Sequence, residues 1–466
     1  MLPPLIRSTR SVSRSRETGI TLALVAVGLL SIIAMAAISI DIGTLYQAKA
    51  EAQRAADGAA LAAARVISIS GITGDPADAA SSWEPTCGGT SSAATLAALA
   101  VAQQNPISGN TAYSVEVHYG TKAGVGTSTS CVGLGTSFAV NPIITVSVQQ
   151  AKLPTFFARI FSMMPSGTSS NSGVSATATA EAFNPSGSGT PSASDMKPVQ
   201  PRCVKPWIIP NTDPGNLPNG FVSAAGNIVN PGTYKANTGV IGESFSLDAG
   251  CSPGQSSCNG ANLTFVPPGY VAGHLQYLPA EVSGNPGAIP SCATASVYQE
   301  AIAGCDQNTR YTCGTPKATA GATTLDLTEN PVKPDRITGD TSTATQCLIN
   351  RSAGTPANDS LDTTTFPFQI KAGSGNPLAS GVVSANDIVS TSNSIVTLPI
   401  YDGTPLDPGS NPPVTIVGFL QVFINEVSPA GYVNVTVLNV VGCSANATNS
   451  PVTGTSPVPV RLVTRP

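Results

Sequence analysis

The sequence predicts an α+β protein in which a long N-terminal transmembrane helix carries a small α+β unit, followed by a β-rich, disulfide-containing domain. Three observations predict this arrangement. Residues 20–40 form an almost unbroken apolar run, and residues 41–65 continue it with an alanine-rich, helical pattern. Beyond residue 200, Pro and Gly interrupt the chain every few residues, and short alternating stretches replace helical periodicity. Most of the cysteines also lie in this second half.

The apolar run is long enough to cross a membrane. At a rise of about 1.5 Å per residue it spans about 31 Å as a helix, which matches the hydrocarbon core of a bilayer. Arg7, Arg10, Arg14 and Arg16 precede it, and such a positive flank is typical of the cytoplasmic side. We therefore expect residues 1–19 to be cytoplasmic and residues 20–40 to span the membrane once. A cleaved secretory signal is the alternative, although its apolar region usually has about 7–15 residues.

The composition limits the classes of function. Charged residues make up 10% of the chain and the net charge is −4, whereas about 25% is typical of soluble domains. Without a basic patch, we expect no nucleic-acid partner. The cysteines form no Cys-x-x-Cys pair and the two histidines have no ligand-like neighbours, so we expect no metal and no cofactor.

The even number of cysteines favours disulfides in an oxidising compartment. The chain has ten cysteines. Cys87 and Cys131 are the two in the first half, and pairing them would close that half on itself. The other eight allow about 105 pairings, among which the sequence does not choose.

Residues 41–183 predict one α+β domain. The membrane helix is expected to continue as a rod to about residue 67, because alanine is the best helix former and proline is absent there. A second helix is expected over residues 91–104, and Pro154 is expected to open a third. Alternating residues predict strands over residues 112–119, 142–149 and 174–183.

The rod presents a face on which another helix or a sheet could pack. Ser39 and Gly43 have the small-xxx-small spacing of associating helices. Asp41 is expected to be hydrated where the helix leaves the membrane, and Asp57 is expected to pair with Arg54 or with a partner helix. The candidate helix-packing residues are Ser39, Asp41, Gly43, Tyr46, Gln53 and Asp57.

The second half predicts a linker, a β-rich domain and a tail. Residues 184–200 are rich in Ser, Gly and Pro and are typical of a linker. Residues 201–450 form the β-rich domain, and residues 451–466 form a Pro-rich tail. Strands are expected over residues 207–209, 244–247, 263–266, 395–400, 414–425 and 432–441, of which the last two form a hairpin.

Catalytic residues are not evident. His118 is expected on the edge or surface of a strand, and His274 in a Gly/Pro-rich loop. Asp402, Asp407 and Asp306 are interpreted as turn caps rather than as cation ligands. No Gly-x-Ser-x-Gly, His-Glu-x-x-His or phosphate-loop motif occurs. We therefore expect no enzyme and no catalytic site, although a hydrolase in the second half is a weaker alternative.

Three stretches of the N-terminal half resemble the TadG-like family of the tight-adherence (Flp pilus) assembly system. They are RETG at residues 16–19, SIDIGTLY and AKAEAQRAADGAALA at residues 39–46 and 48–62, and PTFFARIF with VSATATA at residues 154–161 and 174–180. The resemblance covers about residues 16–183 and implies a pilin-like α+β unit. Residues 201–466 resemble, more loosely, the extension that some TadG-like proteins carry.

Two departures from related proteins limit what the resemblance implies. The Asp-x-Ser-x-Ser metal motif of von Willebrand A-type domains is absent, so no Mg²⁺-dependent adhesion site is expected. Prepilin-like subunits have Glu at the fifth position after the cleaved glycine, whereas Leu24 stands there after Gly19. We therefore do not expect a prepilin peptidase to process this chain.

The resemblance implies a non-enzymatic, membrane-anchored component of Tad/Flp pilus assembly or secretion. Such a protein would sit in a bacterial inner membrane, with its N-terminus in the cytoplasm and its bulk in the periplasm or outside the cell. It would dock other Tad/Flp pilus-assembly proteins, and self-association into a homo-oligomer is left open. The alternative is a cell-surface adhesin or binding protein with the same anchor, which would require a ligand site in residues 201–466.

Overall fold

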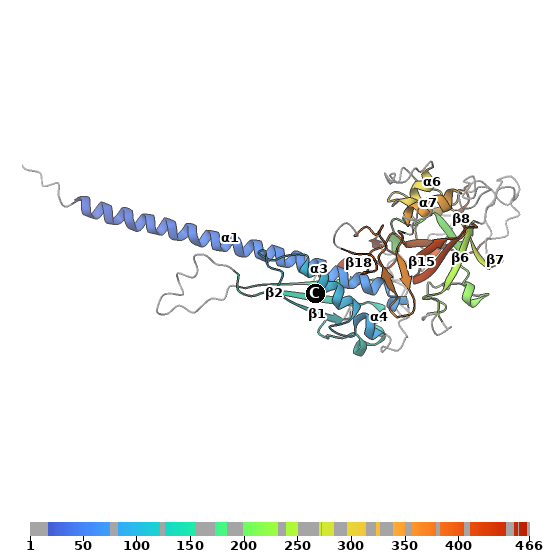
Figure 1. Cartoon of the computed structure of the whole chain (residues 1–466), viewed down its shortest axis with the longest axis horizontal. Helices are drawn as coiled ribbons and strands as arrows, with labels where there is room; N and C mark the ends of the chain where they lie inside the picture. The colour runs from blue at the N-terminus through green and yellow to red at the C-terminus, as the bar shows by residue number, and fades with distance from the viewer. Residues whose placement is uncertain are drawn as a thin grey trace, which may run out of the picture.

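The computed structural model confirms an α+β protein with a long N-terminal helix (Figure 1). It describes residues 17–74, 83–121, 126–153, 173–183, 199–231, 239–249, 270–271, 273–283, 296–313, 323–326, 339–349, 357–378, 383–404, 411–443, 452–454 and 456–463. The first part of the long helix projects from the rest of the molecule, and the remaining elements gather around its C-terminal end (Figure 1).

Helix α1 is a single helix over Glu17–Ile69. Its first part exposes large apolar side chains such as Leu22 (75% exposed) and Leu30 (68% exposed), and the helix is long and apolar enough to span a membrane. From Ala48 onwards one face is buried, and this face consists mainly of alanines. Because a methyl group takes little space, the neighbouring helix and sheet can approach the α1 backbone closely.

The N-terminal unit packs an antiparallel sheet and short helices against α1. Its sheet has the order β1-β2-β3-β18 and consists of β1 (Ser114–Gly120), β2 (Ile143–Gln150), β3 (Val174–Ala182) and β18 (Val460–Leu462). The shorter elements are η1 (Ile72–Gly74), α2 (Glu84–Cys87), α3 (Ala93–Gln103), η3 (Val132–Leu134) and α4 (Thr136–Val140). Ile144, Val146 and Val148 of β2 are buried in the same core as the alanines of α1. The alternation predicted for this strand thus places its apolar side towards the helix.

The C-terminal module is built on a seven-stranded sheet with the order β5-β13-β15-β16-β6-β8-β7. Its strands are β5 (Trp207–Pro210), β6 (Ser244–Ala249), β7 (Tyr270–Val271), β8 (His274–Pro279), β13 (Ile395–Tyr401), β15 (Ile416–Val427) and β16 (Val433–Gly442). The predicted hairpin is its centre, with Leu420 of β15 opposite Val440 of β16. Leu420 and the adjacent Phe419 belong to different apolar clusters. Since successive side chains point to opposite faces, both faces of the sheet are covered.

Smaller elements complete the module. They are β4 (Val199–Pro201), η4 (Pro214–Asn216), α6 (Val297–Ala303), β9 (Thr323–Thr324), α7 (Asp340–Leu348), β10 (Ser360–Asp362), β11 (Gln369–Lys371), β12 (Ile388–Val389), β14 (Pro413–Val414) and β17 (Val452–Gly454). Strands β10, β11 and β12 form one sheet, β14 pairs with β9, and β17 pairs in parallel with β4. The expected linker and tail therefore both contribute short strands.

Several elements differ from the sequence prediction. Helices α6 and α7 and strand β8 were not predicted. Helix α6 has only seven residues, and α7 has the polar sequence DTSTATQCL, so neither shows a clear apolar stripe. His274 begins strand β8 and does not lie in a loop, because β8 pairs in parallel with the distant strand β6.

Some predictions fall on residues that the structure does not describe. They are the arginines before the apolar run, the helix expected from Pro154, the strand expected over residues 263–266, the linker up to residue 198, and Asp407. These remain predictions.

Candidate functional site at the end of helix α1

Three of the predicted helix-packing residues lie on the free surface of α1. Tyr46 is 74% exposed, and a Cβ added to Gly43 would meet no atom within 4 Å. Ser39 is exposed, and its hydroxyl donates a 2.8 Å hydrogen bond to the Met35 carbonyl of the same helix. All three are therefore available for contacts with another molecule.

Asp41 was expected to be hydrated where the helix leaves the membrane, but it is only 6% exposed. The prediction that water hydrates this side chain is therefore wrong. The Asp41 carbonyl accepts a 2.8 Å hydrogen bond from the Thr44 hydroxyl. Asp41 is therefore part of the folded structure and not of the exposed surface of α1.

Gln53 and Asp57 pack against the sheet of the N-terminal unit. The Gln53 amide donates to the Asp57 carboxylate at 2.8 Å and approaches the Thr177 carbonyl of β3 at 3.4 Å. With β3 and the segment containing β18, the two residues line a pocket of about 330 Å³. The expected pair of Asp57 with Arg54 does not form. Gln53 lies one helical turn before Asp57 on the same face and bonds to its carboxylate, whereas Arg54 is exposed.

Disulfides link both halves of the chain internally. Cys87 and Cys131 are bonded, as the sequence favours, with their Cα atoms 5.5 Å apart. In the second half, Cys203 is bonded to Cys305, and Cys313 to Cys443; Cys347 is also disulfide-bonded. These three bonds join cysteines that are 44, 102 and 130 residues apart in the sequence. Such cross-links stabilise a fold by restricting the unfolded chain.

The C-terminal end of α1 is held by the β-rich module. Asn439 of β16 is fully buried, and its amide donates to the Ser68 carbonyl at 2.8 Å and to the Thr73 hydroxyl at 2.9 Å. Gly71 follows the helix with φ +81°, and a Cβ there would lie 2.5 Å from the Ile241 side chain. Only glycine combines this conformation with so close a contact.

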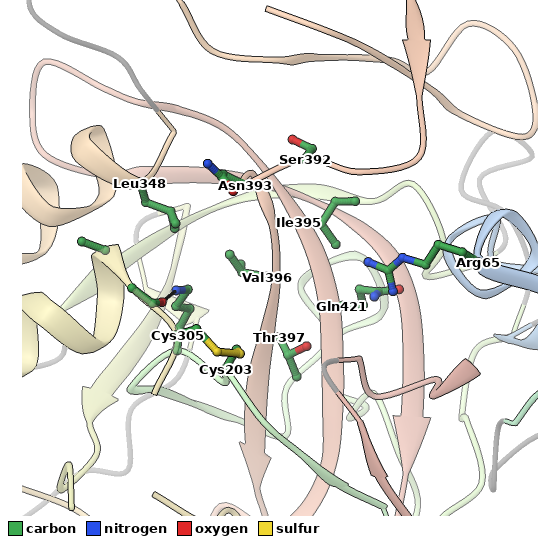
Figure 2. A pocket seen from close by; sticks show the side chains of 13 residues that line it. Arg65, Cys203, Cys305, Leu348, Ser392, Asn393, Ile395, Val396, Thr397 and Gln421 are labelled. Atoms are coloured by element: carbon green, nitrogen blue, oxygen red, sulfur yellow. Dashed lines mark hydrogen bonds between the residues drawn. A yellow bond between two sulfur atoms is a disulfide. The ribbon is translucent and has the colours of Figure 1, made fainter. Parts of the chain in front are cut away.

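A larger pocket lies where α1 meets this module. It has a volume of about 560 Å³. Figure 2 shows Arg65 reaching from α1 towards Gln421 of β15, with Ile395, Val396 and Thr397 of β13 beside them. The lining residues are Arg65, Cys203, Lys205, Ala303, Gly304, Cys305, Leu348, Ser392, Asn393, Ile395, Val396, Thr397 and Gln421. Two of them, Arg65 and Lys205, are basic, and none of these described residues is a carboxylate.

Lys205 forms one wall of this pocket and is held by helix α6. Its ammonium group donates to the Ile302 carbonyl at 2.6 Å and to the Gly304 carbonyl at 2.7 Å. These carbonyls lie at the C-terminal end of the helix, where a cation is favourable. Burial lowers the pKa of Lys205 to about 7, and the negative charge of Asp306 opposes this shift.

The remaining candidate residues have structural surroundings. His118 lies in β1, at the edge of its sheet, as expected. His274 stacks on Tyr432 with ring centroids 3.7 Å apart. Asp402 accepts hydrogen bonds from the Thr404 N–H and hydroxyl, so it caps a turn. Within the described ranges, no group of three or more His, Cys, Asp or Glu residues could hold a metal ion.

Sequence reasoning did not single out the pocket residues. Arg65 ends an alanine-rich stretch of helix, where an arginine is usually solvated, and Gln421 lies in the middle of a predicted strand. Their meeting depends on the way in which the β-rich module docks on α1. An arginine that directly follows a face of buried alanines is the one signal that could have drawn attention to this position.

The fold and these contacts define a membrane-anchor candidate with a small α+β unit and a β-rich module. Residues 19–66 match a family described as putative Flp pilus-assembly TadE/G-like. The match covers α1 from its apolar part to the turn that carries Arg65, and it confirms the expected resemblance over these residues. No curated protein and no solved structure matches the chain.

Proposed function

We propose that this protein is a non-enzymatic component of a tight-adherence (Flp) pilus assembly or secretion system. It is anchored in a bacterial inner membrane by one span, with the N-terminus in the cytoplasm and the folded bulk in the periplasm. The observation that carries the proposal is the family match over residues 19–66. This match lies on one continuous helix that is apolar and exposed at one end and buried in the protein at the other.

The proposed mechanism is docking. The buried half of α1 fixes the helix to the folded unit, so its position relative to the membrane is set before any partner binds. Ser39, Gly43 and Tyr46 then form an exposed strip that begins in the last turn of the span and continues beyond it. A helix of another assembly protein could approach this strip closely, since two of its three residues are small.

Cross-linking in living cells tests this proposal. The protein would be expressed in its own host with a C-terminal tag and with a photoreactive amino acid at Tyr46 or, as a control, at Leu96. Leu96 is also exposed (52%) but lies on α3, away from the strip. We expect Tyr46 to capture pilin, platform or secretin subunits of the assembly system, and Leu96 to capture them much less.

The opposite result would favour the adhesin alternative. If neither position captures an assembly subunit and the tag is cleaved by protease on intact cells, the docking role in the periplasm is wrong. A tag that is cleaved only after the outer membrane is opened would support the proposed localisation.

A further inference from the structure

Arg65 is a cation without a protein partner in the pocket between α1 and the β-rich module. Among the residues that the structure describes, no carboxylate, carbonyl or hydroxyl oxygen accepts a hydrogen bond from its guanidinium group. The described residues that line the pocket include no Asp or Glu. Lys205, the second cation, is already bound by carbonyls of α6. Arg65 is half-buried, and withdrawing an unpaired charge even partly from water costs free energy unless an opposite charge accompanies it.

Gln421 supplies a second unpartnered polar group in the same pocket. Its side chain is 1% exposed, and its amide nitrogen donates to the Ser456 hydroxyl at 2.8 Å. Its Oε1 atom is buried and accepts no hydrogen bond within the described part of the chain. Buried acceptors of this kind are nearly always satisfied, so the position calls for an N–H or O–H donor.

These two groups specify complementary features of a ligand. A guanidinium binds a carboxylate through two parallel hydrogen bonds, and the amide oxygen of Gln421 requires a donor beside that carboxylate. The volume of about 560 Å³ lies in the range of about 300–1,000 Å³ that is usual for small-molecule sites. The pocket is therefore large enough for a ligand of several non-hydrogen groups.

We propose that this pocket binds a carboxylate that carries a neighbouring N–H or O–H donor. The carboxylate pairs with Arg65 and the donor satisfies Oε1 of Gln421. A 2-hydroxy acid and the C-terminus of a peptide both have this chemistry. Because the ligand would contact α1 and the β-rich module at once, its binding would strengthen the junction between them. The inference goes beyond pilus assembly and does not depend on it.

Thermal unfolding of the full-length protein in detergent tests the proposal. The probes are lactate and N-acetyl-glycylglycine, which represent the two sources, with lactamide and the C-terminal amide of the peptide as uncharged controls. Inorganic phosphate is the fifth probe. We expect at least one carboxylate to raise the melting temperature in a concentration-dependent way, because a ligand of the folded state stabilises it, and neither amide to do so.

Two substitutions locate the effect. Arg65→Gln should weaken carboxylate binding about ten- to hundred-fold, which corresponds to one lost charge-assisted interaction. The melting temperature without ligand should not fall, since the change removes an unpaired charge from a half-buried position. Gln421→Glu places a carboxylate in the pocket and should abolish the response to both carboxylates. Arg54→Gln, on the exposed side of the same helix, is the control and should change nothing.

Each other outcome rejects the assignment. A response to phosphate alone, or equal responses to acids and amides, would exclude a carboxylate with a neighbouring donor. A response that persists in Arg65→Gln would place the site elsewhere. If no probe acts and Arg65→Gln lowers the melting temperature, the arginine supports the fold and the pocket is not a carboxylate site.

Discussion

Asp213 and Glu243 bring two carboxyl groups together inside the β-rich module. Asp213 caps η4 by accepting a 3.0 Å hydrogen bond from the Gly215 N–H, and both side chains are buried. Burial, together with the hydrogen bond to Asp213 and the negative charge of Asp213, raises the pKa of Glu243 to about 8. Glu243 therefore holds a proton at neutral pH and can donate it to Asp213.

This proton makes stability depend on pH. Glu243 has an ordinary pKa of 4.5 and a folded-state pKa of about 8. Between these values the folded protein binds a proton that the unfolded chain has lost, so the free energy of unfolding decreases as pH rises. We expect Glu243→Gln to remove this decrease and to stabilise the protein at pH 8, as measured by urea unfolding between pH 5 and 9. The exposed Glu116 gives the control Glu116→Gln, and an unchanged pH slope in Glu243→Gln would contradict the assignment.

Asn439 joins the two halves of the chain through a single side chain. Replacing it by leucine removes the donor to the Ser68 carbonyl and to the Thr73 hydroxyl, both of which lie in the protein interior. We expect Asn439→Leu to lower the free energy of unfolding by about 1–3 kcal/mol. Asn219→Leu is the matched control, because Asn219 is exposed and its amide bonds only to Asn216. Equal stability of the two variants would show that the Asn439 contacts contribute little.

At the residue scale, the sequence indicates local contacts but not long-range ones. The exposed Tyr46 could be placed from the helical period of α1 alone. Asp41 could not, because the helical period does not show that its side chain is buried. The same holds for Arg65 and Gln421, which are separated by most of the chain and meet only after the β-rich module has docked.

Among the elements, predictability follows the strength of the periodic pattern. Helix α1 and the hairpin β15–β16 are long and strongly patterned, and the structure places them within a few residues of their predicted bounds, the usual uncertainty of helix and strand ends. Helix α7 lacks an apolar stripe, and its Ala344 and Leu348 become core residues only because the sheet lies beneath them. Strand β8 is defined by its pairing with β6 rather than by its own sequence.

The turn after α1 determines how the β-rich module attaches to the helix. Gly71→Ala would place a Cβ 2.5 Å from the Ile241 side chain and 3.2 Å from the Leu438 carbonyl, in a residue with φ +81°. We expect a loss of about 1–3 kcal/mol of stability from overpacking and backbone strain. Gly43→Ala is the control, because it lies in a helix with no atom within 4 Å and should be neutral or slightly stabilising. Similar melting temperatures for the two variants would contradict this account.

In the molecule as a whole, the two halves are less separate than the composition suggests. Strand β18, in the expected tail, extends the N-terminal sheet by pairing with β3, and Arg461 forms an ion pair with Glu181. A three-residue strand carries too little pattern to predict its partner, and here the partner lies 280 residues away. The sequence therefore predicted a tail over residues 451–466, whereas β18 in this segment forms the edge strand of the N-terminal sheet.

Because β18 of the C-terminal half pairs with β3 of the N-terminal half, we predict that the two halves stay together when the connection between them is cut. A protease site would be inserted between residues 184 and 198, and the full-length protein would be cleaved in detergent. The N-terminal fragment would retain α1 and β3, and the C-terminal fragment would retain β18 and Asn439. We expect the two fragments to elute together in size-exclusion chromatography, because the β3–β18 pairing and the contacts of Asn439 remain.

A variant that lacks residues 456–466 and carries Asn439→Leu removes both sets of contacts. After cleavage its fragments should separate, whereas those of a variant that lacks only residues 464–466 should not. Separation of the fragments in the otherwise unchanged chain would contradict the prediction and would make the two halves independent domains. If the fragments remain together, α1 and the β-rich module form one unit, so a force or a partner acting on the module is transmitted directly to the anchor helix.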